Sequence, residues 1–389
     1  MLVRPLMPGI AIAVAVCAVG CAEKGTTSGA TFAIDSSGRF PVVTAHGRAA
    51  RWQATQLFTI GATEGGPIEF NSVRSVLLDS AGVLVVVDDG NRTVNEFDST
   101  GTFVRQIGRD GAGPGEYRNP YSVAWLDGNL ALLDPGNYRL AVFDRKGKWV
   151  TSWPVQPVTG GQFIRLYRTP PGFSAFAYRR TEGGSQNLYV PYTLSGPQDT
   201  IALAAHPADL ERGIMCNRPD KAISFYSNPF AASFLQVPLG GGRQAIARTD
   251  AYRIAVLGST GDTTLVITGD ATPAPVSDAD WKAGMADWEK FRVDWPTAQC
   301  DRASFTRPQV KPVLNWLFLD GEGRLWVQVE SSEGIRYDVF DDAGGPVASV
   351  DGLPRSEGLD PSVTGSRAAF VVRDSTTDVT AVRVFRLKR

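Results

Sequence analysis

The chain has only two histidines and four cysteines among its 389 residues, and this scarcity argues against several kinds of active site. A serine-histidine-aspartate triad needs a histidine as its base, and a zinc site needs Cys or His ligands at short, regular spacing. His46 lies in "TAHGR" and His206 in "AAHPADL", and neither stands in such a pattern. We therefore expect surface or capping roles for both histidines, no nucleophilic triad and no zinc centre.

An excess of charge of one sign is also absent. The chain has 39 Lys and Arg residues against 40 Asp and Glu residues, and no long block of like charge apart from the short basic end "RLKR". Proteins that bind nucleic acid concentrate Lys and Arg on one surface. The composition therefore argues against nucleic acid as a partner.

The apolar run at the N-terminus is too short to cross a membrane. It extends from Gly9 to Val19 after a single positive charge at Arg4, whereas a spanning helix needs about 20 apolar residues. This pattern is typical of a secretory signal peptide. We expect residues 1–20 to be that signal peptide.

The end of this run, Ala18-Val19-Gly20-Cys21, resembles the lipobox of bacterial lipoproteins, although the usual Leu three positions before the Cys is missing. The resemblance implies cleavage before Cys21, a lipid on its thiol, and export to the bacterial cell envelope, with anchoring at the periplasmic face or the outer membrane. The alternative is an uncleaved anchor in which Cys21 is only a small apolar residue. Residues 21–50, which begin with the Gly- and Thr-rich "CAEKGTTSGAT", are then expected to form a flexible tether and lead-in.

Two cysteines are left for the folded part, since Cys17 leaves with the signal peptide and Cys21 carries the lipid. They are Cys216 and Cys300. Exported proteins fold in an oxidising compartment, so we expect these two residues to form a disulfide. Two separate buried thiols are the alternative, because sequence does not show whether the pairing geometry is available.

An internal repeat dominates the rest of the chain. The stretch from Glu69 matches the stretch from Glu116 position after position, at an offset of 46 or 47 residues, and a third copy includes "LFLDGEGRLWVQVE". Each unit has four short apolar or alternating runs separated by turn residues, a pattern that predicts four antiparallel strands. Such a unit cannot bury both of its faces alone, and a period in the forties is typical of propeller blades.

The stretches "GPGEYRNPYSVA" and "LLDPGNYRLAVFDRKGKWV", with their counterparts elsewhere, resemble the six-bladed β-propellers built from NHL-like repeats, especially the bacterial lipoprotein members. The resemblance implies an all-β fold in which residues 51–389 form six four-stranded antiparallel blades. The third and fourth blades carry longer inserts. The run 51–61 is expected to supply the outer strand of the last blade and so close the ring.

One short helical insert is expected near residues 277–292, because Ser277 can cap a helix with Asp280 three residues later. Trp281, Met285 and Trp288 would share one face of that helix. The expected role is a helix on the flank of the propeller, with a partner-binding helix as the alternative. Cys300 follows the helix and could tie the insert to Cys216.

The aspartates that end the second strands admit two interpretations. Asp88, Asp89 and Asp134 could offer oxygen ligands to calcium in the central channel, as in gluconolactonase-like propellers. However, Asp followed by Gly and Asn is foremost turn chemistry. Because the pattern repeats with the blades, we favour the structural role and expect no bound cofactor or metal.

The loops between second and third strands and the connectors between blades should emerge on the same face of the ring. That face would carry a mixture of cationic, acidic and aromatic groups, which suits a protein, peptide or glycan partner. Its residues are Arg92, Arg109, Glu116, Tyr117, Arg118, Tyr121 and Arg139.

The leading hypothesis is a cell-envelope lipoprotein whose propeller is a non-enzymatic binding scaffold. The first alternative is a metal-assisted lactonase-like or lyase-like enzyme with its site in the channel, and the second is a structural or assembly role in the envelope. Peptide-amidating lyases share the resemblance but use a zinc centre with several histidines, which this chain does not have.

Overall fold

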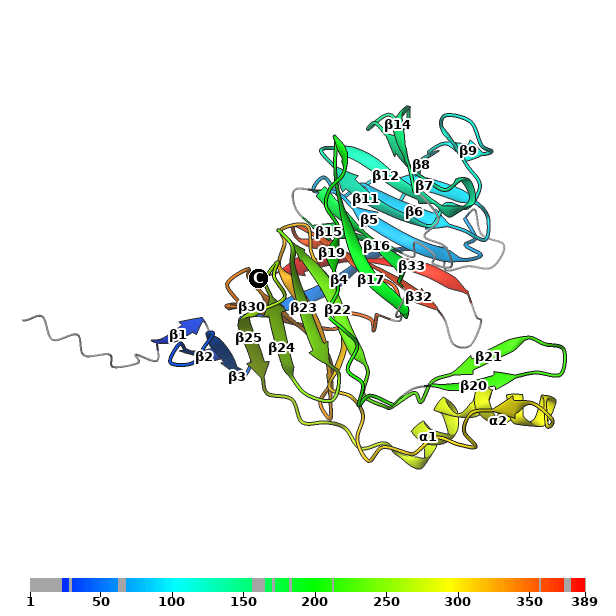
Figure 1. Cartoon of the computed structure of the whole chain (residues 1–389). Coiled ribbons are helices and arrows are strands. Elements are labelled where there is room, and N and C mark those ends of the chain that lie inside the picture. The colour runs from blue at the N-terminus through cyan, green and yellow to red at the C-terminus, as the bar shows by residue number, and fades with distance from the viewer. Residues whose placement is uncertain are drawn as a thin grey trace, which may run out of the picture.

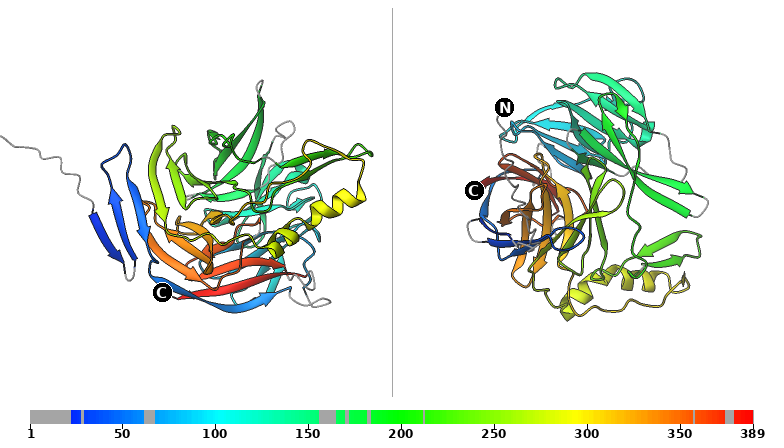
Figure 2. Two further views of the ribbon diagram at one scale, coloured as in Figure 1. Left: turned by 90° about the horizontal axis from the view of Figure 1, so that it is seen from below. Right: turned by 60° about the vertical axis from the view of Figure 1, so that its left-hand side comes forward.

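A computed structural model describes residues 23–27, 30–61, 68–155, 165–169, 172–181, 184–211, 213–356, 358–373 and 379–388. Residues 1–20, which we expect to be a signal peptide, and Cys21 lie outside the described residues. Most described segments are β-strands arranged as six blades around one channel, and Figures 1 and 2 show the ring with a separate body at its side. Among the described residues, no helix has both the length and the apolar character that crossing a membrane requires.

Blades 1 and 2 are four-stranded antiparallel meanders, as the repeat predicts. Blade 1 consists of β5 (Val73–Leu78), β6 (Leu84–Asp88), β7 (Thr93–Phe97) and β8 (Phe103–Gln106). Blade 2 consists of β11 (Ser122–Leu126), β12 (Asn129–Asp134), β13 (Arg139–Phe143) and β14 (Trp149–Pro154). Their facing sides bury one shared cluster, which includes Leu77, Val85, Val87, Leu130 and Leu132. Each side chain of this kind contributes about 1.5–3 kcal/mol when it is fully buried.

Blade 3 is less regular. Two long strands, β16 (Gly172–Thr181) and β17 (Gly184–Thr193), follow the inner strand β15 (Leu166–Thr169). The outer position is shared by two short strands that both pair with β17, namely β18 (Gly196–Pro197) and β19 (Ile201–Ala202). The blade that the sequence predicts is present, but its outer edge is broken.

Blade 4 carries the N-terminal residues on its outer edge. It consists of β22 (Phe234–Gly240), β23 (Arg243–Arg248), β24 (Arg253–Leu257) and β25 (Thr263–Gly269). Strand β3 (Val42–His46) pairs in parallel with β25, and β2 (Ala30–Asp35) and β1 (Glu23–Thr27) continue the sheet outward. The expectation of a flexible tether over residues 21–50 is therefore wrong for these strands. Val43 shows the reason, because its side chain is buried in the blade 4 core.

Blades 5 and 6 form one continuous sheet. Blade 5 consists of β27 (Leu314–Leu319), β28 (Leu325–Ser331), β29 (Gly334–Phe340) and β30 (Pro346–Asp351). Blade 6 consists of β31 (Ser362–Thr364), β32 (Arg367–Arg373), β33 (Thr380–Lys388) and β4 (Arg51–Ile60). Strand β4 pairs antiparallel with β33 over most of its length and in parallel with the end of β30. The predicted closure of the ring by an N-terminal strand is confirmed.

The inner strands of blades 6, 1, 2 and 3 are joined around the channel by serine hydroxyls. The Oγ of Ser362 accepts the backbone N–H of Leu78 at 2.8 Å, and the Oγ of Ser122 accepts that of Leu166 at 3.0 Å. Ser75 makes the corresponding contact with Val123 at 3.3 Å. These bonds fix the height of each inner strand relative to the next, so side chains at equivalent positions meet across the channel.

A small body, which we call the insert, stands beside the ring. It is built from the connectors before and after blade 4, residues 203–233 and 270–313. Its strands are β20 (Ile214–Asn217), β21 (Ile223–Tyr226) and β26 (Gln299–Cys300), and its helices are α1 (Asp278–Gly284) and α2 (Ala286–Asp294). The capping box of Ser277 and Asp280 is present at the start of α1, as the sequence predicts. The helices therefore belong to a separate body instead of lying flat on the flank of the propeller (Figure 1).

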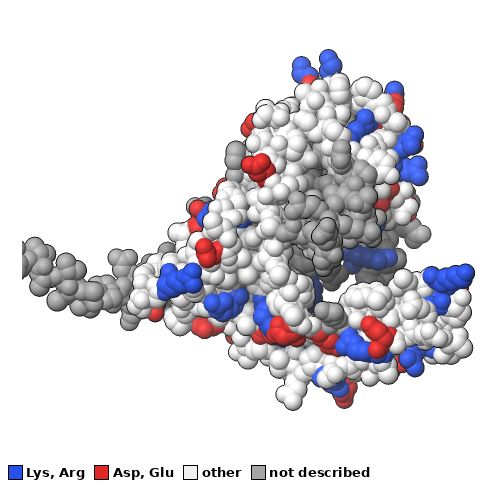
Figure 3. Space-filling view, viewed as in Figure 1, with Lys and Arg blue, Asp and Glu red and all other residues white. Residues whose placement is uncertain are grey.

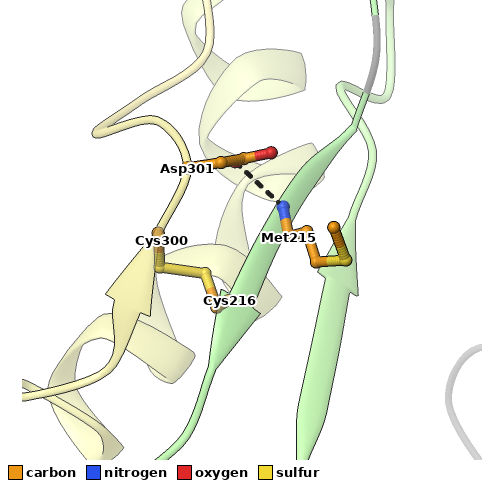
Figure 4. The surroundings of a disulfide bond; sticks show 4 residues. All are labelled: Met215, Cys216, Cys300 and Asp301. Carbon is orange, nitrogen blue, oxygen red and sulfur yellow. Dashed lines mark hydrogen bonds between the residues drawn. A yellow bond between two sulfur atoms is a disulfide. The ribbon is translucent and has the colours of Figure 1, made fainter.

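A disulfide and an aromatic cluster hold the insert together. Cys216 and Cys300 are directly opposite each other on β20 and β26 and form the disulfide shown in Figure 4. On the same side of the sheet, Trp288 and Phe291 of α2 pack against Tyr226. The insert thus has its own small core, separate from the clusters between the blades.

Candidate functional site

The aspartates at the ends of the second strands are structural latches. In blade 1 the buried carboxylate of Asp88 accepts the backbone N–H groups of Asn71 at 3.0 Å and Ser72 at 2.8 Å, and the side-chain amide of Asn91 at 2.8 Å. In blade 2 the buried Asp134 accepts the corresponding backbone bonds, and its bond from Asn137 is 2.7 Å long. This repetition confirms the turn interpretation that we favoured for Asp88 and Asp134. Across the described residues, no group of three His, Cys, Asp or Glu side chains could hold a metal ion.

A second series of aspartates shapes the turns on the opposite face. Asp98 accepts the backbone N–H groups two and four residues later, at 2.8 and 3.0 Å, and Asp144 and Asp341 do the same in their blades. Hydrogen bonds from Thr100 lower the pKa of Asp98. These carboxylates are committed to their own turns.

Two residues of the predicted loop-rich face are not displayed on it. The prediction that Tyr117 lies on the surface is wrong, because its ring is fully buried. Its hydroxyl accepts hydrogen bonds from the backbone N–H of Val94 and the side chain of Gln106, both at 3.2 Å. Burial raises the pKa of Tyr117. Arg139 is mostly buried, and its guanidinium donates to the carbonyl oxygens of Gly113 and Glu116 at 2.8 Å. Both residues hold the connector between blades 1 and 2 in place.

The connector 108–120 is a fixed structure. Arg109 in β9 (Arg109–Asp110) forms an ion pair of 2.9 Å with Glu116 in β10 (Glu116–Tyr117), and the two short strands pair in parallel. Glu116 also accepts the backbone N–H of Gly113 at 2.7 Å. That hydrogen bond and the one from Arg109 lower the pKa of Glu116. Of the predicted face, the exposed cations are Arg92, Arg109 and Arg118, which we call the rim cations.

The centre of the same face is formed by residues at the beginnings of the inner strands. Because every inner strand starts on the connector side, its first residues meet at one mouth of the channel. They are Arg74 on β5, Tyr121 before β11, Arg165 before β15, Trp316 on β27 and Asp360 before β31. Arg74 lies over the ring of Tyr121 at 5.3 Å from its centroid, so Tyr121 is the one residue of the predicted face that reaches this mouth.

Arg165 is the centre of this group, which we call the mouth cluster. Its guanidinium pairs with Asp360 at 3.1 Å and lies over the rings of Trp316 and Tyr167 at 5.2 and 5.7 Å. Asp360 also accepts the indole N–H of Trp316 at 2.7 Å. Burial opposes the charge of Arg165, yet Asp360 and Tyr167 hold its pKa above the usual value. The cluster therefore holds a cationic guanidinium between a carboxylate and two aromatic rings.

Two buried tyrosines lie beside Arg165: Tyr167 on β15 lines the cavity along the inner strands, and Tyr189 on β17 lies between blades 3 and 4. Tyr167 and Tyr189 lie edge to face with ring centroids 5.3 Å apart, and the hydroxyl of Tyr189 donates to the carbonyl of Gln236 at 3.3 Å. Burial raises the pKa of Tyr167 to about 12 and that of Tyr189 well above its usual value. Both phenols therefore stay neutral near pH 7 and act as hydrogen-bonding groups.

The channel below the mouth is narrow. The cavity along the inner strands has a volume of about 60 Å³, which is room for a few water molecules. Arg168 at the far end of β15 donates to the hydroxyl of Thr364 at 3.0 Å and narrows the opposite end. A ligand larger than a few atoms does not fit inside this cavity.

Sequence reasoning missed Arg74, Arg165, Trp316 and Asp360. They stand at the starts of inner strands, and aligning the repeats on those starts would have grouped Arg74 with Tyr121. Arg165 and Asp360 lie in the weaker repeats, where no motif marks the beginning of the blade. His46 and His206, as expected, are exposed, and they contact Asp270 and the backbone of Pro207 respectively.

Six blades of antiparallel strands around one channel define the class of the molecule, which is a β-propeller. Residues 68–124 match a family model described as a 6-bladed beta-propeller. The chain is also 28% identical over 166 residues to the E3 ubiquitin-protein ligase NHLRC1 of Homo sapiens, a match that covers 38% of this chain and 42% of that protein. The chain thus spans less than half the length of this curated relative. The fold is that of a six-bladed β-propeller, and part of the chain is similar in sequence to this relative.

Solved structures with a similar arrangement include a Streptogramin B lyase, with 10% identity, a TM-score of 0.39, and coverage of 87% of this chain and 98% of that one. Another is the calcium-binding protein regucalcin from Agrobacterium tumefaciens str. C58, with 12% identity, a TM-score of 0.38, and coverage of 86% and 95%. The fold assignment rests on the blades of the chain itself and on the family match.

Proposed function

We propose that this protein is a non-enzymatic binding propeller of the bacterial cell envelope, and that a protein or peptide partner binds at the mouth cluster. The observation that carries the proposal is the arrangement of Arg165, Trp316 and Asp360 over a channel that is closed to larger ligands. Arginine and tryptophan are enriched in the residues that contribute most to protein binding. Their rigidity matters as well, because side chains that are already ordered lose little conformational freedom when a partner binds.

The chemistry of the mouth favours a polypeptide over a small metabolite. Asp360 and Arg165 offer an acceptor and a donor side by side, which matches the alternating donors and acceptors of a peptide backbone. Trp316, Tyr167 and Tyr121 surround them with aromatic surface. A glycan is the second ligand chemistry that such a surface suits.

The binding test compares the mouth with the rim of the same face. A Trp316→Ala and Arg74→Ala double variant removes aromatic and cationic surface while it leaves the pair of Arg165 and Asp360 intact. The control is the triple variant Arg92→Ala, Arg109→Ala and Arg118→Ala, which removes the three exposed rim cations. Envelope partners are crosslinked in cells and quantified by mass spectrometry. We expect the mouth variant to lose its partners by about tenfold and the rim variant to keep them. An unchanged profile for the mouth variant would overturn the proposal.

The anchor is tested separately. If Cys21 carries a lipid, cells labelled with a radioactive fatty acid will label the wild-type chain, and Cys21→Ala will abolish that label. Cys17→Ala is the matched control and should keep it. Retention of the label by Cys21→Ala would refute the lipoprotein assignment without touching the binding proposal.

A further inference from the structure

One sheet face of the insert is apolar and exposed. Along β20 and β21 the side chains alternate, so Ile214 and Cys216 are buried against the helices while Met215, Ile223 and Phe225 point the other way. These three side chains are 48%, 66% and 64% exposed. Met215 is directly opposite Phe225, and Ile223 is two residues from Phe225 on the same face. Together they form a continuous apolar surface on a body that the disulfide makes rigid.

Strand β21 also has a free edge. The sheet order is β21, β20, β26, so within the part of the chain that the structure describes, β21 pairs on one side only. The register between β20 and β21 determines which main-chain N–H and C=O groups point outward from that edge. The N–H and C=O groups of Met215 both bond to Asp301, at 3.1 and 3.0 Å, and therefore point away from β21 (Figure 4).

The pair of Met215 and Phe225 is consequently a non-hydrogen-bonded pair of the antiparallel ladder. The main-chain groups of Phe225 must then point outward from β21, and those of Ile223, two residues away, point the same way. The same two residues thus present a free donor and acceptor on the edge and an apolar side chain on the face. Nothing in Ile223–Tyr226 is charged, whereas natural edge strands are usually protected by charge, proline or a covering element.

The free edge is turned toward the ring. In Figure 1 the hairpin of β20 and β21 lies between the helices of the insert and the blades, and β21 is its strand on the side of the ring. Figure 3 shows a hollow in the surface between the insert and the ring. Both connectors that build the insert leave the ring on the face that carries the mouth cluster.

We propose that β21 binds an extended segment of a protein partner, which adds a fourth strand to the sheet of the insert. Main-chain groups of Ile223 and Phe225 would bond to the segment, and apolar side chains at alternate positions of the segment would pack on Met215, Ile223 and Phe225. This is the strand-addition mode of peptide recognition, in which backbone bonds give affinity and alternate side chains give specificity. The inference rests on the proposed function in that the mouth cluster would contact the same partner.

The probe for the test is a displayed library of short random peptides, selected against the full chain with its disulfide intact. We expect the selected peptides to carry apolar residues at alternate positions. Ile223→Pro removes an outward N–H without disturbing the pairing with β20, because proline is tolerated on the free side of edge strands. Phe225→Lys removes the apolar surface. Each variant should weaken peptide binding, measured by fluorescence polarisation, by about tenfold or more.

A matched control lies in the same body. Val293 on α2 is 78% exposed and lies outside the β20–β21 sheet. Val293→Lys should leave binding within about twofold of the wild type. Circular dichroism of all three variants verifies that the insert is folded. If Ile223→Pro alone fails to fold, the comparison of Phe225→Lys with Val293→Lys still decides the question.

Peptide chemistry gives a readout that a purely structural effect of the variants would not produce. Methylation of the amide nitrogens that face β21, at alternate positions of a selected peptide, should abolish binding, while methylation of the other set should not. Equal binding of both methylated peptides, unchanged binding to Phe225→Lys, or the absence of any selected peptide would overturn the inference. A concentration-dependent dimer that Phe225→Lys disrupts would also overturn it, since the occupant would then be a second copy of the chain.

The experiments distinguish a failure of this inference from a failure of the proposed function. Trp316→Ala in the same assay tests the mouth, and Phe225→Lys tests the insert. Loss of cellular partners in the mouth variant together with unchanged peptide binding to Phe225→Lys would leave the proposed function standing and remove the role of β21.

Discussion

Blades 1 and 2 and the insert are stabilised in contrasting ways. The two blades repeat the same polar latch, in which a buried aspartate accepts two backbone N–H groups and one asparagine amide, at both Asp88 and Asp134. The insert has no repeat, and one disulfide and a few aromatic rings hold it together. Stability in the ring is therefore spread over many equivalent contacts, whereas in the insert it is concentrated in a few. Single changes in the insert should have larger and more local effects.

Trp288→Ala should have the largest effect. Trp288 is buried and its ring contacts those of Tyr226, Phe291 and Phe305, so its truncation should cost the insert about 4 kcal/mol. Hydrogen exchange measured by mass spectrometry should show loss of protection in 214–226 and 278–294, with β6 and β12 unchanged. Trp149→Ala on the outer strand of blade 2 is the control and should have a small effect. Simultaneous loss of protection across the blades would contradict the claim that the insert is stabilised separately from the ring.

Removal of the disulfide should come next. It closes a loop of 84 residues between Cys216 and Cys300 that includes blade 4, and disulfides typically contribute about 2–4 kcal/mol to stability. The double variant Cys216→Ala and Cys300→Ala should unfold at lower denaturant concentration than the wild type, in a first transition that reports on the insert and blade 4. Reducing agent should shift the wild type in the same way and leave the variant unchanged. An identical wild-type curve with and without reducing agent would contradict this.

Asp134→Ala tests a single latch. Removal of the Asp134 carboxylate leaves the backbone N–H groups of Arg118 and Asn119 without their acceptor. This loss should lower the free energy of unfolding by about 2 kcal/mol. Asp89→Ala is the control, because Asp89 is partly exposed and its contact with Arg74 is long, at 3.4 Å. If both variants lose the same stability in thermal denaturation, the latch is not what distinguishes the blades.

Ser277→Ala should have a smaller effect, confined to α1. The hydroxyl of Ser277 accepts the backbone N–H of Asp280 at 3.1 Å, and loss of such a cap costs about 1 kcal/mol of helix stability. Chemical shifts of residues 278–284 in an NMR spectrum should move toward coil values. Ser259→Ala in a turn of blade 4 should leave them unchanged.

The same helix start should respond to acid. Hydrogen bonds from Lys311 and Ser277 lower the pKa of Asp280 from 3.8 to about 2. A carboxylate whose pKa is lowered in the folded state stabilises that state above its ordinary pKa, and the contribution is lost as pH falls toward the lowered value. We expect α1 to fray between about pH 4 and pH 2, and Lys311→Met to move the midpoint upward. A midpoint that Lys311→Met does not move would contradict this assignment.

The sequence predicted the ring well because blades are encoded locally. Strands, turns and the latches at Asp88 and Asp134 depend on residues within one repeat, and the offset between Glu69 and Glu116 exposes them. The disulfide and the cap at Ser277 were also readable, since each needs only residue type and context. The flexible lead-in was mispredicted because Val43 is buried by blade 4, more than two hundred residues later in the chain, which no local pattern reveals.

The candidate site was less predictable for a related reason. Arg165, Trp316 and Asp360 come from three different blades, and only closure of the ring brings them together. Tyr117 was assigned to the surface because its connector is rich in glycine and polar residues, yet its ring fills the space between β7 and the connector. Whether a side chain in such a connector points outward depends on what the neighbouring blade leaves open.

The shared strand β4 has a consequence for how the protein is made. Its residues 51–60 leave the ribosome more than three hundred residues before their partner β33. During synthesis, β4 therefore remains unpaired with β33 until Thr380–Lys388 have been made. A chain that stops before Thr380 would leave β4 and β32 without the strand β33 that pairs with both, so blade 6 would keep exposed edges.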